Sequence, residues 1–236
     1  MASQIQSQPD TVCSSLQKVL DPVVFFPWGG LALRYLGIQI DFDTHMIAIR
    51  DEDYDIANQK LKAAGYATAT PDRRRVFDLM NEDPTPVEVV RRFNADNERI
   101  DLLSTMFTYP AEDPSIGAKL VLIQNSFACL PLHGSPSTPT PANPGPSVDT
   151  EKYDTHGTII YPLEQVLLES FVRAAIDEEF EMGNSTWLVL LKTWITIMIR
   201  HLPVDKTILD DCADHTIPDW YRGQFGRMFD ANGGEG

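Results

Sequence analysis

Two pairs of residues near the amino terminus have types and spacing suited to holding metal ions and phosphate groups. Asp41 and Asp43 are separated by one residue. On a strand, side chains alternate between the two faces, so this spacing places both carboxylates on one face, where they can share Mg²⁺. Eleven residues before Asp41 the chain has Gly30, directly preceded by Gly29. A glycine pair has no side chains, so its backbone amides can approach a phosphate.

Asp78 and Asp101 are candidates for a further carboxylate beside this pair, because each lies inside a short apolar run that is typical of a strand. A polar residue that points outward from a half-buried strand explains either position equally well. If the protein is an active enzyme, we expect Asp41, Asp43 and Asp101 to be its acidic catalytic residues.

Other chemistry finds less support in the sequence. The three cysteines, Cys13, Cys129 and Cys212, are far apart and odd in number, which favours reduced thiols over disulfides or a metal site. The basic cluster 73–75 is typical of a solvated turn in so acidic a chain. The chain has no Gly-x-Ser-x-Gly elbow and no phosphate-binding loop that ends in Gly-Lys-Ser or Gly-Lys-Thr.

The elements that must position these residues follow from hydrophobic periodicity and glycine punctuation. The amino-terminal half predicts helices at 12–20, 31–35 and 54–64, the last two closed by Gly37 and Gly65, and a buried strand at 46–49. Further strands are expected at 75–79, 99–103 and 119–123, and a short helical piece at 87–93. The carboxy-terminal half predicts a strand at 158–162 and helices at 163–175, 187–199 and within 207–229.

These elements divide the chain into five parts. We expect a disordered tail at 1–11, an α+β core at 12–130 and a Pro-rich mobile loop at 131–154. A mainly helical portion at 155–229 packs on the core, and 230–236 form a second disordered tail.

The composition limits the possible partners. The chain has 236 residues, 43% of them hydrophobic, and a net charge of -15. So acidic a protein repels nucleic-acid backbones and anionic lipids, which argues against a broad nucleic-acid surface and against membrane association. The most apolar run, 187–199, is shorter than the roughly 20 residues of a membrane span. With no secretory signal at the start of the sequence, we predict a soluble cytoplasmic protein and leave a nuclear location open.

The stretch from Trp28 to Gly37, with the strand and acidic turn after it, resembles the opening of the nucleotidyltransferase superfamily, that is, the polymerase-β-like enzymes and the minimal nucleotidyltransferases. The whole layout, including the Tyr161-Pro162 helix start, resembles a group of fungal proteins with that fold. The resemblance implies a nucleotidyltransferase-like mixed sheet with flanking helices and an α-helical carboxy-terminal portion. It also implies that Gly29 and Gly30 lie beneath the nucleotide phosphates, with a carboxylate pair on the next strand holding Mg²⁺.

Two alignments of that carboxylate pair compete. The first uses Asp41 and Asp43. The second counts seven residues beyond Gly37 and reaches Thr44 and Met46, neither of which holds magnesium strongly. We favour the second alignment, because the apolar strand 46–49 is followed at once by Arg50 and Asp51, as in the fungal group that the chain resembles.

The second alignment makes the protein a catalytically degenerate member of the fold, a pseudoenzyme that acts by binding a nucleotide or a protein partner. The alternatives are an active Mg²⁺-dependent nucleotidyltransferase that uses Asp41 and Asp43, and an accessory protein of a fungal biosynthetic pathway with no chemistry of its own.

Overall fold

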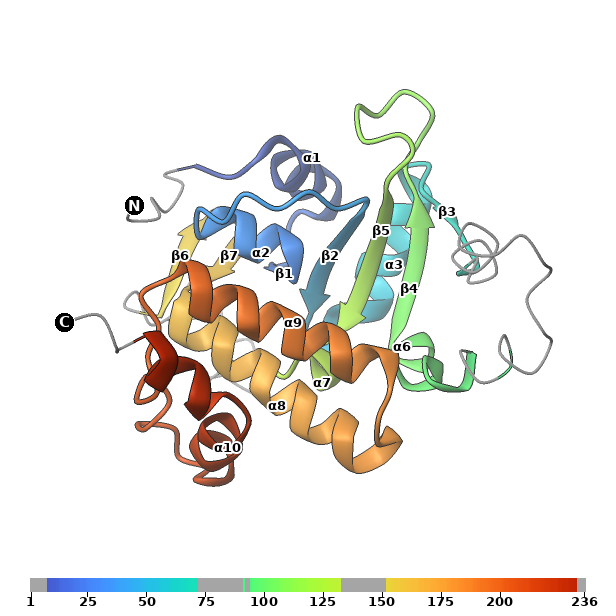
Figure 1. Cartoon of the computed structure of the whole chain (residues 1–236). Coiled ribbons are helices and arrows are strands. Elements are labelled where there is room, and N and C mark those ends of the chain that lie inside the picture. The colour runs from blue at the N-terminus through green and yellow to red at the C-terminus, as the bar shows by residue number, and fades with distance from the viewer. Residues whose placement is uncertain (1–7, 72–90, 92–93, 133–151, 233–236) are drawn as a thin grey trace, which may run out of the picture.

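The computed structural model describes residues 8–71, 91, 94–132 and 152–232 (Figure 1). Within them the chain forms a mixed seven-stranded sheet covered by helices. From one edge to the other the strands are β3 (Ala67–Thr68), β4 (Ser104–Thr108), β5 (Lys119–Gln124), β2 (Thr44–Ile49), β1 (Phe25–Trp28), β7 (Ile159–Pro162) and β6 (Tyr153–His156). β2 is parallel to β5 and β1 is parallel to β7, whereas the other neighbours are antiparallel. The sheet is therefore mixed, in agreement with the coarse expectation of an α+β protein.

Helices pack on both faces of the sheet because its central strands are apolar on both sides. One face carries α1 (Thr11–Leu20) and α3 (Tyr54–Ala63), which bury their apolar side chains against Ile47 and Ile49 of β2. The other face carries α8 (Glu164–Met182) and α9 (Thr186–His201), which pack on Met46 and Ala48 of the same strand. The strand alternation thus divides the core into two layers, and α8 and α9 lie in front of the sheet in Figure 1.

The remaining helices lie at the ends of strands or on α8. α2 (Gly30–Tyr35) follows β1, α7 (Asn125–Ala128) follows β5, and a single 3₁₀ turn, η1 (Asp51–Asp53), joins β2 to α3. α10 (Thr216–Asn232) packs on α8. Among the described residues, no helix is both long enough and apolar enough to cross a membrane.

A buried polar contact ties the sheet to α8. The Trp28 indole N–H donates to Ser170 Oγ at 2.9 Å, and Ser170 donates in turn to the carbonyl of Ala128. Trp28 also makes edge-to-face contacts with Phe171 and Trp194, with ring centroids 5.4 and 5.3 Å apart. Because every polar atom of this contact is paired, it adds a fixed docking geometry to the apolar packing.

Most of the predicted helices and strands that fall on described residues are present, but one prediction is wrong. Residues 99–103, expected as a strand, belong to α6 (Glu98–Leu102), and the strand β4 begins only at Ser104. The helix buries Ile100, exposes Leu102, and ends where Ser104 Oγ donates to the Ile100 carbonyl. A five-residue apolar run fits either element, so its period could not distinguish them.

The boundaries of the expected tails and loop also need correction. Asp10 is the N-cap of α1, accepting from the Cys13 amide at 2.8 Å, so the ordered chain begins before residue 12. Tyr153 and Asp154, expected in the Pro-rich loop, form the start of β6. α10 begins at Thr216 and continues to Asn232, into the expected tail. The predictions for 73–75, 75–79, Asp78, 87–90, 92–93, 133–151 and the outermost residues of both tails lie outside the described residues.

Candidate functional site

The Gly29–Gly30 turn links β1 to α2, as predicted, but apolar side chains fill the space beside it. Gly29 has φ +57°, a left-handed backbone conformation that strongly favours glycine. A β-carbon on Gly29 would lie 2.9 Å from the Trp194 ring and 3.3 Å from Met46 Sδ. The Phe42 ring occupies the space that a β-carbon on Gly30 would take. The glycines therefore permit close packing of three apolar side chains.

Met46 and Trp194 at this turn are part of the core between the sheet and α9. Met46 is 8% exposed and Trp194 is 6% exposed. Met46 lies opposite Trp28 in the β1–β2 pairing, which sets it directly beside the turn. Position 46 is where the favoured alignment places the second metal-binding carboxylate, and the thioether there is a soft, apolar group with little affinity for magnesium.

Asp41 and Asp43 lie before the strand and not on it. β2 begins at Thr44, so the strand agrees with the alignment that uses Thr44 and Met46. Asp41 and Asp43 are exposed on either side of the half-buried Phe42. The Asp43 carbonyl accepts from the Lys119 amide at 2.8 Å, and one carboxylate oxygen of Asp43 accepts from the Thr44 hydroxyl at 3.2 Å. These contacts are those of a loop that leads into a sheet.

The structure does not bring Asp101 near the other two acidic residues. Asp43 precedes the amino end of β2, whereas α6 leads into Ser104, which pairs with Ile123 beside the carboxyl end of β2. A six-residue strand spans roughly 17 Å, so Asp101 and Asp43 lie at opposite ends of the sheet. Among the described residues, no three His, Cys, Asp or Glu side chains form a group that could hold a metal ion.

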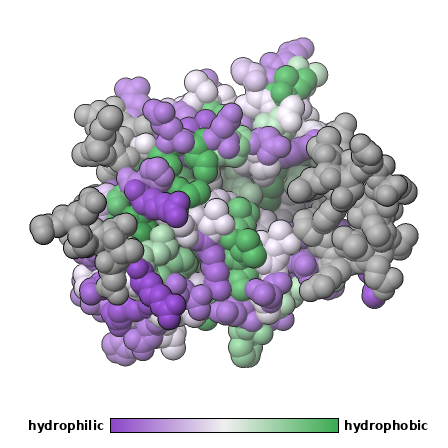
Figure 2. All heavy atoms as spheres, viewed as in Figure 1, coloured by the Kyte–Doolittle hydropathy of each residue, from purple (hydrophilic) through white to green (hydrophobic). Residues whose placement is uncertain are grey.

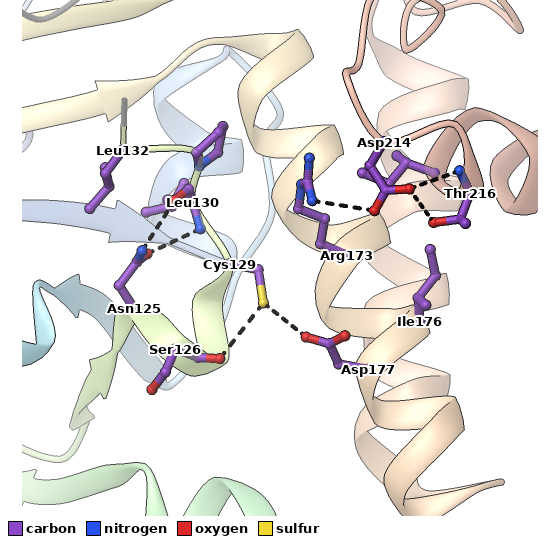
Figure 3. A pocket seen from close by; sticks show the side chains of 12 residues that line it. Asn125, Ser126, Cys129, Leu130, Leu132, Arg173, Ile176, Asp177, Asp214 and Thr216 are labelled. Carbon is purple, nitrogen blue, oxygen red and sulfur yellow. Dashed lines mark hydrogen bonds and ion pairs between the residues drawn. The ribbon is translucent and has the colours of Figure 1, made fainter. Parts of the chain in front are cut away.

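A cavity of about 440 Å³ lies elsewhere, between the segment that follows β5 and the helices α8 and α10 (Figure 3). One wall comes from Asn125, Cys129 and Leu130, and the opposite wall comes from Arg173 and Asp177 of α8. The other lining residues are Ser126, Pro131, Leu132, Ile176, Asp214, Thr216 and Ile217. Its volume falls in the range of sites for small molecules.

A second cavity of about 210 Å³ adjoins the first, sharing Asn125 and Leu132 with it. Its other lining residues are Arg50, Asp51 and Glu52. Arg50 directly follows β2 and Asn125 directly follows β5, and these two strands are parallel neighbours. The cavities thus open at the carboxyl ends of adjacent parallel strands, which is where α/β sheets commonly bind ligands.

Internal hydrogen bonds hold the cavity wall that follows β5. The Asn125 amide donates to the Leu130 carbonyl at 3.1 Å and accepts from the Leu130 amide at 3.0 Å, which closes the segment into a ring. Inside that ring Cys129 adopts φ +54°, an uncommon conformation for a residue other than glycine. A side chain that clamps both ends of its own loop makes the wall rigid before any ligand arrives.

The Cys129 thiol at this wall is protonated at neutral pH. Its Sγ donates to Asp177 Oδ2 at 3.4 Å across the cavity (Figure 3). Burial, and next the negative charge of Asp177, raise the pKa of the Cys129 thiol to about 12. A nucleophilic cysteine needs a lowered pKa, so Cys129 acts here as a neutral donor.

The residues that line the two cavities were not identified as site residues from the sequence. One signal could have found Arg50 and Asn125, because each lies within two residues of the end of an apolar run that is predicted as a strand. Arg173 and Asp177 gave no signal, since they lie one helical turn apart on the polar side of an amphipathic helix. Comparisons with protein-family models, with curated proteins and with solved structures found no match to this chain.

Proposed function

We propose that this protein has a nucleotidyltransferase-like fold without the transfer reaction, and that it acts by binding a nucleotide or a protein partner. The observation that carries the proposal is the packing at the Gly29–Gly30 turn. Met46 and Trp194 fill the space beside Gly29, and β2 presents Thr44 and Met46 where the favoured alignment expects carboxylates. Two-metal transfer needs adjacent carboxylates that hold both ions, and a buried thioether does not supply them.

A protein partner is supported by apolar side chains at the surface of the α8–α9 hairpin. Phe180 near the end of α8 is 90% exposed, and Val189 near the start of α9 is 59% exposed. Figure 2 shows apolar side chains over the middle of the face along which α9 runs in Figure 1. Exposed apolar side chains that form a contiguous patch are typical of surfaces that bind other proteins.

Thermal-shift titration with ATP, GTP, CTP and UTP, each with and without Mg²⁺, tests the proposal. A ligand that binds only the folded state stabilises it by about 2.7 kcal/mol at 100 times its dissociation constant. We expect no magnesium-dependent rise in melting temperature, and no difference between the wild type and Asp41→Asn or Asp43→Asn. A metal-independent rise identifies a nucleotide as the ligand, whereas no rise with any nucleotide directs the search to protein partners.

The active-enzyme alternative makes the opposite prediction for the same titration. A magnesium-dependent rise that either aspartate substitution abolishes would show that Asp41 and Asp43 hold metal. That result would overturn the proposal and justify an assay of nucleotidyl transfer.

A further inference from the structure

Arg50 carries a buried polar atom that has no partner. The residue lines the smaller cavity at the carboxyl end of β2. Its Nε is buried and makes no hydrogen bond, and in the described part of the chain no carboxylate lies within ion-pair distance of its guanidinium. A guanidinium has only donors and is never deprotonated in proteins. A buried donor without an acceptor is costly, so this position is suited to an acceptor from outside the chain.

Of the four carboxylates that line the two cavities, three already accept hydrogen bonds from the protein, and the fourth, Glu52, belongs to an exposed residue of the smaller cavity. Asp51 Oδ1 accepts from the Ser126 amide at 3.0 Å. Asp177 accepts from the Cys129 thiol, and Asp214 accepts from the amide at the start of α10. Among the described lining residues, the buried side-chain atom that lacks a partner is therefore Arg50 Nε, a positive donor that suits an anionic group.

The larger cavity adds an apolar surface next to that donor. Leu132 lines both cavities, and the larger one continues from it to Leu130, Ile176 and Ile217. A group seated against these side chains loses contact with water, which favours hydrocarbon over further charge. The site thus offers one cationic end and one apolar wall, joined at Leu132.

We propose that the two cavities form one binding site for a small organic anion, whose carboxylate or phosphate pairs with Arg50 and whose apolar body lies along Leu132 and Ile176. The site rests on the proposed function in that the protein binds this molecule and does not transform it. It lies at the opposite end of β2 from the Gly29–Gly30 turn. Carboxylate and phosphate share the acceptor geometry that a guanidinium recognises, so the experiment must separate them.

Isothermal titration calorimetry with four small aromatic probes tests this inference. Phenylacetate supplies a carboxylate and phenyl phosphate supplies a phosphate, each on the same ring. Benzyl alcohol and benzylamine are the neutral and cationic controls. We expect one or both anions to bind and the two controls to bind at least tenfold more weakly, with the stronger anion identifying the head group.

Substitution of Arg50 locates the site. Arg50→Gln should weaken anion binding by about 10- to 100-fold, the usual effect of losing hydrogen bonds to a charged group. Arg50→Lys should retain part of the affinity, because it keeps the charge and loses the planar fork. Arg200→Gln, at an exposed position in the last turn of α9, is the matched control and should bind as the wild type does. The Arg50→Gln variant should keep the wild-type melting temperature, since the side chain it removes makes no hydrogen bond to the part of the chain that the structure describes.

Three results would overturn the inference. They are the absence of binding by both anions, anion binding that Arg50→Gln leaves unchanged, and benzylamine binding as tight as that of the anions. A magnesium-dependent rise in melting temperature with a nucleotide would instead refute the proposed function. The Arg50 measurements test only the anion site, so the two failures can be distinguished.

Discussion

Introducing a carboxylate at position 46 should destabilise the protein and not create a metal site. Met46 is 8% exposed and touches the turn at Gly29 beside Trp194. Met46→Asp would place the acid where the favoured alignment expects one. If the space beside the turn is packed core, the new carboxylate is buried against aromatic and aliphatic groups. Met46→Asn is the matched neutral variant, with nearly the same shape and no charge.

The expected magnitude follows from burial and from the pKa of the new acid. Losing the burial of a methionine side chain costs about 1.5–3 kcal/mol, and burying an unpaired polar group adds about 1–3 kcal/mol, so both variants should lose about 3–6 kcal/mol. Burial raises the pKa of the introduced carboxyl group in the folded state above its unfolded value of about 3.9. The folded state therefore prefers the protonated acid. Below pH 4 the two variants should be equally stable, and above it the Met46→Asp variant loses about 1.4 kcal/mol more per pH unit until the folded-state pKa is reached.

Urea unfolding of both variants between pH 4 and pH 7 measures this difference. Met46→Leu, which conserves volume, should lose less than about 1.5 kcal/mol and shows that position 46 tolerates substitution. If Met46→Asp and Met46→Asn remain equally stable at pH 7, the carboxylate is solvated and the turn is not packed core. Stabilisation of Met46→Asp by Mg²⁺ would refute the reasoning completely, because it requires an open site with other ligands beside it.

Two further predictions concern α8 and the cavity. Ser170→Ala leaves the Trp28 indole N–H and the Ala128 carbonyl without partners, so it should lower the free energy of unfolding by about 2–4 kcal/mol. The control is Thr193→Ala, because the Thr193 hydroxyl donates only to the Val189 carbonyl of its own helix at an exposed position. This control should change the free energy of unfolding by less than about 0.5 kcal/mol. Equal effects in urea unfolding would show that the buried contact is unimportant. Alkylation of Cys129 by iodoacetamide, followed by mass spectrometry, should accelerate about tenfold per pH unit from pH 8 to pH 10, because burial and then Asp177 raise the thiol pKa to about 12. Asp177→Asn should speed the reaction at pH 8, and a rate that levels off near pH 9 would contradict the raised pKa.

Elements with a long or strongly punctuated pattern could be predicted from the sequence. α8 has an unbroken helical repeat, and α2 and α3 end at Gly37 and Gly65, both with positive φ. α6 and the edge strand β6 could not be predicted, because each is a short run whose local preference is weak. Their conformations depend on contacts made by residues far away in the chain, such as the β7 strand that pairs with β6.

At the candidate site, the sequence motif and the position of the strand lead to different conclusions about metal binding. Asp41-Phe42-Asp43 has the spacing of a metal-binding pair, yet that spacing places two carboxylates on one face only where the residues lie on a strand. β2 begins at Thr44, where its pairing with β5 starts, and continues as an apolar run to Ile49. Asp41 and Asp43 therefore lie outside the sheet.

The same strand geometry points to the opposite end of β2. A parallel pair of strands places the residues that follow both of them at one edge, whatever their identity. β2 and β5 are such a pair, so Arg50 and Asn125 meet there although 75 positions separate them in the sequence. No local sequence motif predicts that Arg50 and Asn125 line the same cavity, because their proximity depends on which strands are neighbours in the sheet. An arginine that follows a buried strand and whose buried Nε finds no acceptor among the described residues is therefore stronger evidence for a ligand than an acidic pair that fits a pattern but lies in a solvated loop.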